Sequence, residues 1–244
     1  MRLDGRVAIV SGGTSGMGAA AARGLAAEGA TVVVGGRNRG RGTALADEIG
    51  GIFQPADVTR VADCRALAQR AVDELGRVDV LVNCAGILPL GSITEVTEEG
   101  FDEAWRANVK GTFFCGQAVI PHMLEQGRGK IVNFTSVAGL AGVAGGSVYC
   151  TTKGAIVTMT KAWAVELAPH GLNVNAIAPG TVETPMNEAF REDPAFDAMT
   201  RGATPQGRNG QVDDVVPMVV FLASDDAKWM NGSIVAVDGG WLAT

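Results

Sequence analysis

Residues 7–18 read VAIVSGGTSGMG and contain the pattern that decides the fold. The apolar, mostly β-branched start predicts a buried strand, and the Ala-rich stretch after Gly18 predicts a helix. Between them, Gly12, Gly16 and Gly18 allow a tight turn, close approach of the backbone to a pyrophosphate, and close helix–strand packing. The free N–H groups at the start of the helix would then face the phosphates. We therefore expect a dinucleotide-binding strand–turn–helix in this part of the chain.

The alternation of short apolar runs and longer helix-like stretches continues along the whole sequence. Strands are predicted at residues 7–10, 31–34, 51–54, 79–82, 130–134, 173–177 and 234–237. Helices are predicted at residues 16–28, 39–49, 62–75, 101–124, 148–167 and 212–222. Near-continuous apolar strands separated by helices indicate a parallel sheet that is covered on both faces. We therefore predict an α/β fold: a single doubly wound, Rossmann-type domain of residues 1–244 with about seven strands.

Residues 179–210 form the longest stretch with neither a clear strand nor a clear helix, and they contain four prolines. A loop of this length in a compact domain is usually functional or mobile. We therefore expect a substrate lid at about residues 183–210. Pro217 lies early in the helix predicted next, and proline is tolerated only near the first turn of a helix. The sequence thus leaves the start of that helix open.

The composition excludes several classes of protein. With 26 acidic and 20 basic residues the net charge is −6, which argues against a nucleic-acid-binding protein. No uninterrupted apolar run is long enough for a membrane span, and the N-terminus becomes polar too early for a signal peptide. Four cysteines without metal-ligand spacing and only two histidines predict reduced thiols, a cytoplasmic protein and no metal site.

The only tyrosine of the chain, Tyr149, precedes Lys153 by four residues. Residues at this spacing share one face of a helix, and a cation beside a phenol lowers the pKa of the phenol. A tyrosine so placed can act as a general acid or base near neutral pH. Ser136 follows a predicted strand, at the sheet edge where open α/β sheets bind ligands. An exposed tyrosine beside a surface lysine would give the same spacing, so the pair alone leaves its role open.

Ser136, Tyr149 and Lys153 form the pattern S-x12-Y-x3-K after an N-terminal GxxxGxG, and together they resemble the short-chain dehydrogenase/reductase family over essentially the whole chain. The resemblance implies hydride transfer between a nicotinamide and a carbonyl or alcohol carbon. Tyr149 would exchange the proton, Lys153 would lower its pKa and hold the ribose, and Ser136 would bind the carbonyl oxygen. Asn108 stands at the family's catalytic asparagine, whose backbone carbonyl would hold a water that links Lys153 to solvent.

Further motifs of the family imply a cofactor site made of strand ends and the loops after them. The expected cofactor-binding residues are Gly12, Thr14, Ser15, Gly16, Met17, Gly18, Arg37, Asn38, Asp57, Val58, Asn83, Ala85, Gly86, Tyr149, Lys153, Pro179, Gly180, Val182 and Thr184. The chain departs from the family at VNCAG, where Cys84 replaces the second asparagine of NNAG. Asn83 and the following Ala85 and Gly86 remain, so we expect the cofactor contacts to persist.

The end of the second strand indicates which dinucleotide is preferred. An acidic residue about 20 positions after the glycine turn would bind both ribose hydroxyls and select NAD. Gly36 stands there instead, and Arg37 follows, with Arg39 and Arg41 adding positive potential suited to a phosphate. A solvated turn would also explain these arginines, and Ser15 takes the place of a second basic residue found in the strongest NADP binders. We predict that NADP(H) is preferred and that NAD(H) is also possible.

The candidate substrate residues are mostly apolar and predict a lipophilic carbonyl or alcohol substrate. They are Leu88, Pro89, Leu90, Ala138, Val143, Met186, Phe190 and Met199. The main alternative is reduction of a 3-oxoacyl group on an acyl carrier protein. Lys130 could meet such an acidic partner, but His170 stands where the resemblance leads us to expect arginine.

Two further alternatives belong to other classes of protein. A non-catalytic dinucleotide-binding regulator is disfavoured by the presence of Tyr149 and Lys153. A halide-eliminating lyase is disfavoured by the intact glycine motif. The family is usually tetrameric, and the helices predicted at 101–124 and 148–167 are rich in apolar residues, so we expect a homotetramer with 222 symmetry.

Overall fold

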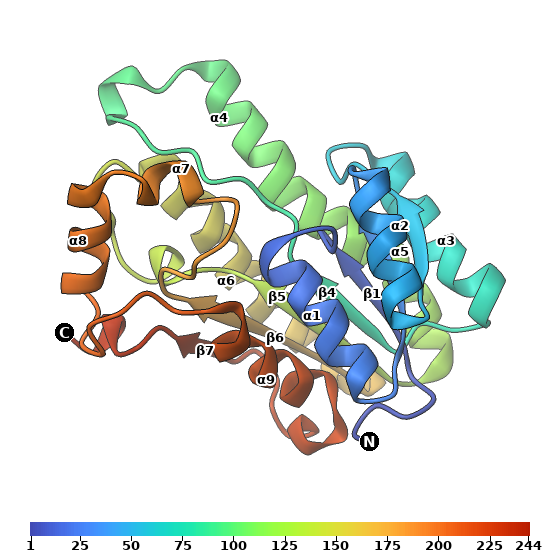
Figure 1. Cartoon of the computed structure of the whole chain (residues 1–244). Coiled ribbons are helices and arrows are strands. Elements are labelled where there is room, and N and C mark those ends of the chain that lie inside the picture. Colours follow the sequence, from blue (N-terminus) through green and yellow to red (C-terminus); the bar gives the residue numbers. More distant parts are fainter.

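In the computed structural model, which describes residues 1–244, seven parallel strands form one sheet in the order β3-β2-β1-β4-β5-β6-β7 (Figure 1). The strands are β1 Val7–Ser11, β2 Thr31–Gly36, β3 Ile52–Pro55, β4 Val80–Asn83, β5 Gly129–Phe134, β6 Leu172–Pro179 and β7 Ile234–Val237. Their order reverses between β1 and β4, and open α/β sheets bind ligands at the carboxyl ends of the strands at such a point. The predicted doubly wound parallel sheet of seven strands is confirmed.

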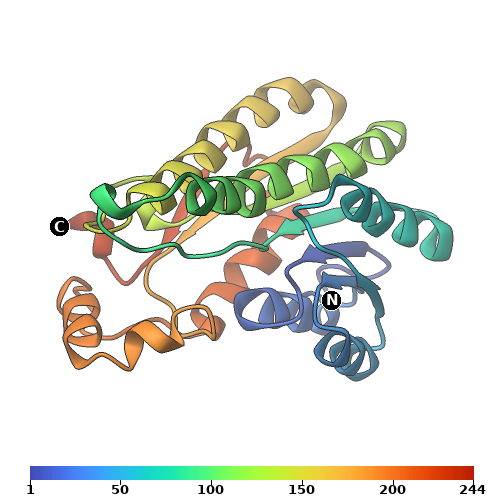
Figure 2. The same ribbon diagram turned by 90° about the horizontal axis from the view of Figure 1, so that it is seen from above.

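Helices cover both faces of the sheet, as the view from above in Figure 2 shows. One layer contains α1 Gly16–Ala27, α2 Arg39–Ile49 and α9 Val212–Ala223, and the other contains α3 Val61–Leu75, α5 Gly111–Gln126 and α6 Ser147–Leu167. Successive residues of β1 alternate between these layers: Ala8 and Val10 pack into the first, and Val7 and Ile9 into the second. Because both faces of each strand are buried, the strands are uninterrupted apolar runs in the sequence.

The helix predicted at residues 101–124 begins earlier and is not uniform. It consists of α4 Glu98–Ala104, a π-helical turn Trp105–Lys110 and α5. Thr97 caps α4 by accepting a hydrogen bond from the Gly100 N–H at 3.1 Å. Single π-helical turns inside α-helices occur frequently at functional sites. This one contains Asn108, a predicted catalytic residue.

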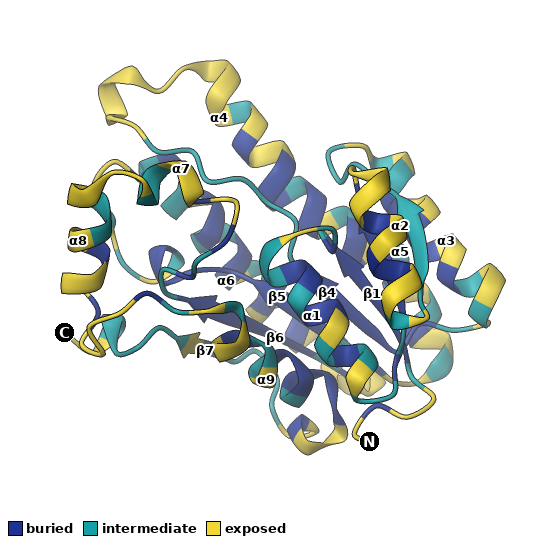
Figure 3. Cartoon of the chain, viewed as in Figure 1, coloured by how far each residue is buried: buried dark blue, intermediate teal, exposed yellow.

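Residues 179–210 contain two short helices that the sequence analysis missed, α7 Glu188–Arg191 and α8 Pro194–Gly202. Asp193 caps α8 by accepting the Ala195 N–H at 2.9 Å, and Pro194 occupies the first helical position. That combination is a helix-start signal, although the helices are too short to show a clear apolar period. A bridge between Val182 and Gly210 joins the two ends of the segment, much of which is exposed (Figure 3).

Pro217 is the sixth residue of α9 and lies inside the helix, beyond its first turn. The helix starts at Val212, as predicted, because Gln211 and Asp214 form a capping box there. Proline has no N–H, so α9 lacks one backbone hydrogen bond. Packing of the apolar face of α9 against α1 and the sheet compensates for this loss of stability. None of the helices has both the length and the apolar content that crossing a membrane requires.

Candidate active site

The glycine turn after β1 has the shape needed to receive a phosphate group. Gly12 and Gly16 have φ angles of 71° and 52°, a region that favours glycine. A Cβ atom on Gly12 would lie 2.6 Å from the backbone N of Ala85, and one on Gly18 would collide with the Gly12 carbonyl. Ser15, at the N-cap of α1, makes no capping bond, and the first turn has no acidic residue. The N–H groups there suit an anion, so these residues fit a dinucleotide pyrophosphate.

A cleft of about 270 Å³ opens at this turn, at the carboxyl ends of the central strands. Most of the predicted cofactor residues line it: Gly12, Thr14, Ser15, Gly16, Met17, Gly18, Arg37, Asn38, Asp57, Val58, Ala85, Gly86 and Thr184. Asp57 uses Oδ1 to accept hydrogen bonds from the Thr59 N–H at 3.0 Å and hydroxyl at 2.8 Å. Its second carboxylate oxygen remains to accept a hydrogen bond from a ligand.

Asn83 is buried and does not line the cleft. Its side chain belongs to a row of hydrogen bonds across β1, β4 and β5. Ser11 Oγ donates to Asn83 Oδ1 at 3.4 Å, and Asn83 Nδ2 donates to Asn133 Oδ1 at 3.0 Å. Asn133 then donates to the Thr160 hydroxyl of α6 at 3.0 Å. The row joins three strands of the sheet to α6, so Asn83 has a structural place in the sheet and no contact with the cleft.

The end of β6 contributes less to the cleft than the sequence suggested. Pro179 is buried, and Gly180 and Val182 line a separate cavity of about 210 Å³ beside α9. Thr184 does reach the cleft. Asn187 fixes it by accepting the Thr184 N–H at 3.1 Å and donating to the Val182 carbonyl at 2.9 Å.

Ser136, Tyr149 and Lys153 come together at the carboxyl end of β5. Lys153 Nζ lies 5.6 Å from the centroid of the Tyr149 ring and donates a hydrogen bond to the Phe134 carbonyl at 2.9 Å. Ser136 lies close enough to the Tyr149 phenol to influence its pKa, and its Oγ accepts the Ala138 N–H at 3.2 Å. The four-residue spacing on α6 therefore places the phenol and the ammonium on one face, beside the serine hydroxyl.

The expected effect of Lys153 on Tyr149 is not found in the chain by itself. Burial raises the pKa of Tyr149 to about 12, and the nearby Ser136 hydroxyl offsets this rise only in part. Burial also lowers the pKa of Lys153 to about 8. In the chain without a cofactor, loss of hydration disfavours both charged forms and outweighs any effect of Lys153 on the pKa of Tyr149; that Lys153 lowers this pKa during the reaction stays a prediction. Tyr149 is a neutral phenol at pH 7 and can donate its proton.

Asn108 is fully buried in the π-helical turn, and its side chain is fully engaged. Oδ1 accepts the Ile87 N–H at 2.7 Å, and Nδ2 donates to the Ile87 carbonyl and the Thr152 hydroxyl, each at 3.0 Å. Its backbone carbonyl, which we expected to hold a water, accepts the Thr112 hydroxyl at 2.8 Å. A second lone pair of that oxygen remains for another donor. Asn108 thus fixes the segment after Gly86 to α6.

Only three of the eight predicted substrate residues line one of the larger cavities, and they do so in two different cavities. Met186 lines the main cleft, whereas Pro89 and Leu90 line a separate cavity of about 200 Å³ that Val148 also borders. Met199 is exposed on α8. Cys84, which the sequence analysis noted only as a departure from the family motif, also lines the cleft. Sequence reasoning missed further cleft residues, namely Ala56, Thr59, Ile87, Glu103, Ala107 and Pro185. No motif marks them, because they reach the cleft only through the path of the backbone.

Three comparisons place this geometry among known proteins. A family model described as enoyl-(acyl carrier protein) reductase matches residues 12–242. The 3-oxoacyl-[acyl-carrier-protein] reductase FabG of Thermotoga maritima is 38% identical over 98% of this chain and 99% of its own length. The 3-alpha-(or 20-beta)-hydroxysteroid dehydrogenase of Mycobacterium tuberculosis is 41% identical over 99% of this chain and 91% of its own length. The solved gluconate 5-dehydrogenase of Burkholderia cenocepacia, in complex with NADP and tartrate, matches with a TM-score of 0.96 and 35% identity over 100% of this chain and 97% of that chain.

Proposed function

The chain belongs to the short-chain dehydrogenase/reductase family of NAD(P)-dependent enzymes that interconvert ketones and secondary alcohols, and we propose that it prefers NADP(H) and acts on a lipophilic carbonyl substrate. The observation that carries the proposal is the meeting of Ser136, Tyr149 and Lys153 next to a cleft with a glycine-lined phosphate turn. A phosphate-binding turn and a candidate proton donor at the same edge of the sheet support a shared function.

The roles that we assign are those that membership of the family implies, and the proximity of these side chains supports them. The nicotinamide cofactor, when bound, supplies or accepts the hydride at the substrate carbon. In reduction, the Ser136 hydroxyl donates a hydrogen bond to the carbonyl oxygen and stabilises its developing negative charge. The neutral Tyr149 hydroxyl transfers its proton to the same oxygen, which yields the alcohol and a phenolate. The Lys153 ammonium stabilises that phenolate and holds the ribose, and oxidation reverses these proton movements.

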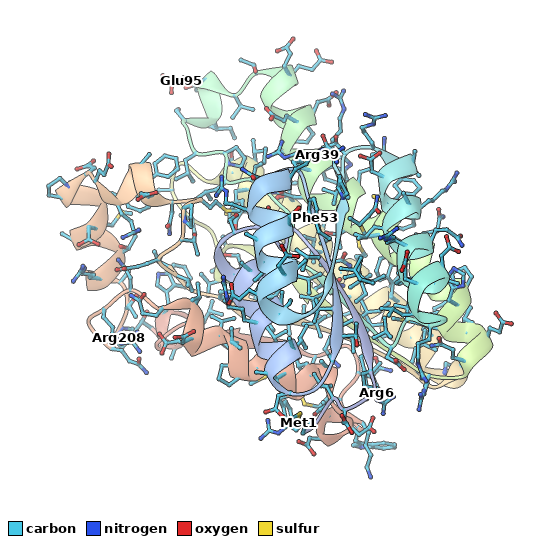
Figure 4. All side chains as sticks on the ribbon, turned by 45° about the vertical axis from the view of Figure 1, so that its right-hand side comes forward. Met1, Arg6, Arg39, Phe53, Glu95 and Arg208 are labelled. Carbon is cyan, nitrogen blue, oxygen red and sulfur yellow. The ribbon has the colours of Figure 1, made fainter.

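The preference for NADP(H) rests on the end of β2. Arg37 and Arg41 line the cleft and form no ion pair with a carboxylate, so their guanidinium groups are available for a phosphate. Gly36 is buried and offers no carboxylate, and a Cβ atom there would lie 2.5 Å from Thr14 Cγ2, so an acidic side chain would displace Thr14. Arg39, at the start of α2 (Figure 4), does not line the cleft.

Reduction of 3-oxoacyl groups on a carrier protein is the second candidate, and the 38% identity to FabG favours it. Lys130, which we considered as the contact for an acidic carrier, lies at the amino end of β5 and donates to Asn173 Oδ1 at 2.7 Å. The cleft opens at the carboxyl ends of the strands, so Lys130 does not border its entrance. We therefore keep this activity second.

The proposal is tested by incubating the purified protein with NADPH and a panel of ketones, following absorbance at 340 nm. The panel includes aliphatic, aromatic and alicyclic ketones and one 3-oxoacyl thioester, and each is repeated with NADH. Turnover of apolar ketones with NADPH is the expected result. A strict preference for the thioester would establish the second candidate. Cofactor binding without any turnover would contradict both and favour the regulatory alternative.

Two statements about the protein in the cell belong to the same proposal. All four cysteines are free, which supports a reducing compartment such as the cytoplasm. Exposed apolar residues on α4, α5 and α6 support assembly into a homotetramer.

A further inference from the structure

Thr152 lies one residue before Lys153 on α6 and is completely buried. Its hydroxyl oxygen accepts a hydrogen bond from Asn108 Nδ2 at 3.0 Å and donates one to the Tyr149 carbonyl at 2.9 Å. A threonine hydroxyl bonded to a carbonyl of the preceding turn is common in helices. The additional bond from Asn108 has no such local origin, because it comes from the π-helical turn 44 positions away in the sequence.

Asn108 continues this connection to the rim of the cleft. It holds both the N–H and the carbonyl of Ile87, which directly follows the cleft residues Ala85 and Gly86. An unbroken row of hydrogen bonds therefore links the segment after β4, the π-helical turn and the turn of α6 that carries the phenol. A one-residue register difference in any of the three would break the row.

The same turn of α6 is held from its other side as well. The Thr135 hydroxyl donates to the Lys153 carbonyl at 2.8 Å, and Lys153 Nζ donates to the Phe134 carbonyl at 2.9 Å. The backbone of residues 149–153 is thus fixed to the end of β5 on one side and, through Thr152, to Ile87 on the other.

We infer that Thr152 is a positioning residue for the reaction: its hydroxyl, shared between Asn108 and the Tyr149 carbonyl, sets the position of Tyr149 and Lys153 relative to the cleft. The inference rests on the function proposed for Tyr149. Thr152 acts through its two partners and does not line the cleft. Thr152 is not one of the residues that define the Ser136–Tyr149–Lys153 motif, so the motif alone does not identify it.

Thr160 offers a matched control on the same helix. Its hydroxyl donates to the Ile156 carbonyl at 2.8 Å and accepts Asn133 Nδ2 at 3.0 Å, and it is also completely buried. Substitution at either threonine therefore removes one bond to the preceding turn and one bond from a buried asparagine amide. Only the two bonds of Thr152 lie beside Tyr149 and Lys153. If Thr152 positions these residues, the two variants should therefore differ in activity.

The first experiment compares Thr152→Val, Thr152→Ser and Thr160→Val in the full chain with NADPH and the best ketone. Valine keeps the shape and removes the hydroxyl, so kcat should fall about tenfold or more, and the KM for NADPH should rise by a smaller factor, because Lys153 is only one of the residues that hold the cofactor. Serine keeps the hydroxyl and should retain at least about half of kcat. Thr160→Val should lose stability without this loss of kcat. Equal activity of Thr152→Val and wild type would overturn the inference, as would equal losses in the valine and serine variants.

A second readout does not depend on turnover, because Tyr149 is the only tyrosine in the chain. Replacing it with 3-fluorotyrosine gives one ¹⁹F resonance whose pH titration reports this phenol alone. Loss of the Thr152 hydroxyl should weaken the contact between Tyr149 and Ser136 and shift the titration upward by about half a pH unit or more. Thr152→Ser and Thr160→Val should titrate like wild type.

The two readouts separate failure of the inference from failure of the proposed function. An unchanged titration in a folded Thr152→Val protein overturns the inference, whatever the activity. A wild-type protein that turns over no ketone overturns the proposed function, while the titration still tests the placement of Tyr149. If Thr152→Val does not fold, Thr152→Ala and Thr152→Ser carry the same comparison, and a serine variant that titrates like alanine overturns the inference.

Discussion

A neutral phenol and a weakly basic lysine face each other in the site. Burial raises the pKa of Tyr149 to about 12 and lowers that of Lys153 to about 8, so both shifts favour the uncharged pair. A protonated phenol suits the donation of a proton to a forming alkoxide, which is the reductive direction. Oxidation requires the phenolate, and its formation depends on a charged Lys153 beside it. At pH 7 the chain therefore presents a protonated phenol, as the proton-donating role of Tyr149 in reduction requires.

The role of Tyr149 as proton donor is tested by Tyr149→Phe, which removes one hydroxyl and keeps the ring. We expect kcat to fall by about 10²–10⁴-fold because general acid catalysis contributes an effect of that order. Binding of NADPH, followed by quenching of tryptophan fluorescence, should remain within a few-fold of wild type. A variant that keeps more than about a tenth of the wild-type kcat would show that another group donates the proton.

The cofactor preference is tested at Arg37, because substitution of Gly36 by aspartate would also displace Thr14. Arg37→Ala should lower kcat/KM for NADPH by about tenfold or more, since a hydrogen bond to a charged group contributes about 1.5–3 kcal/mol. The value for NADH should change little. Arg39→Ala is the matched control, because Arg39 is also exposed but does not line the cleft. A wild-type kcat/KM that is already higher for NADH would contradict the assignment.

Lys153 should make the stability of the protein rise with pH. Its pKa is lowered to about 8 by burial, below the value of about 10.4 in an unfolded chain. Between these pH values the unfolded chain binds more protons at this residue, so the free energy of unfolding increases with pH, by at most about 1.4 kcal/mol per unit. Urea unfolding at pH 8 and pH 9 should show a larger rise for wild type than for Lys153→Met. Lys130→Met is the control, because Lys130 is more exposed and should contribute less.

At the scale of elements, the positions of the strands could be predicted from the sequence. Six predicted strands end within two residues of the observed ones and β7 agrees fully, because buried apolar runs are bounded by glycine and polar residues. The π-helical turn Trp105–Lys110 was not predicted, since it differs from an α-helix only in backbone register. Motif spacing identified Tyr149 and Lys153. It could not identify Thr152, because the role that we infer for Thr152 depends on a contact with Asn108, which lies in a distant part of the sequence.

The segment of residues 183–210 is expected to close over the substrate. The Val182–Gly210 bridge holds the two ends of this segment together. Between them, Met186 and Met199 expose apolar side chains that could contact an apolar substrate. Trypsin should cleave after Arg191 or Arg201 in the free protein and more slowly with NADP(H) and a substrate or product present. Cleavage after Lys228, at the opposite end of the sheet, should not change. If ligands did not slow cleavage after Arg191 or Arg201, the segment would not act as a closing lid.

At the scale of the whole molecule, two surfaces have the features of subunit contacts. One runs along α4, the π-helical turn and α5, where Phe101 and Trp105 stack at 6.2 Å and Phe113 is also exposed. Next to it, α6 presents small residues outward, ending at Val165, which is 79% exposed. Small side chains let two helices approach closely across a two-fold axis. The second surface is the edge strand β7, which has a neighbour on one side only.

Two such surfaces, each pairing with its own copy, generate a tetramer with 222 symmetry. We therefore expect light scattering at micromolar concentration to give a particle four times the 25.1 kDa mass of the chain. Val165→Glu places an unpaired charge at the α6 contact without touching the core, so it should reduce the particle to a dimer held through β7. Val165→Ala, which stays apolar, should remain a tetramer. A wild-type particle of 25 kDa would reject the assembly, and a tetrameric Val165→Glu protein would place the contact on another surface.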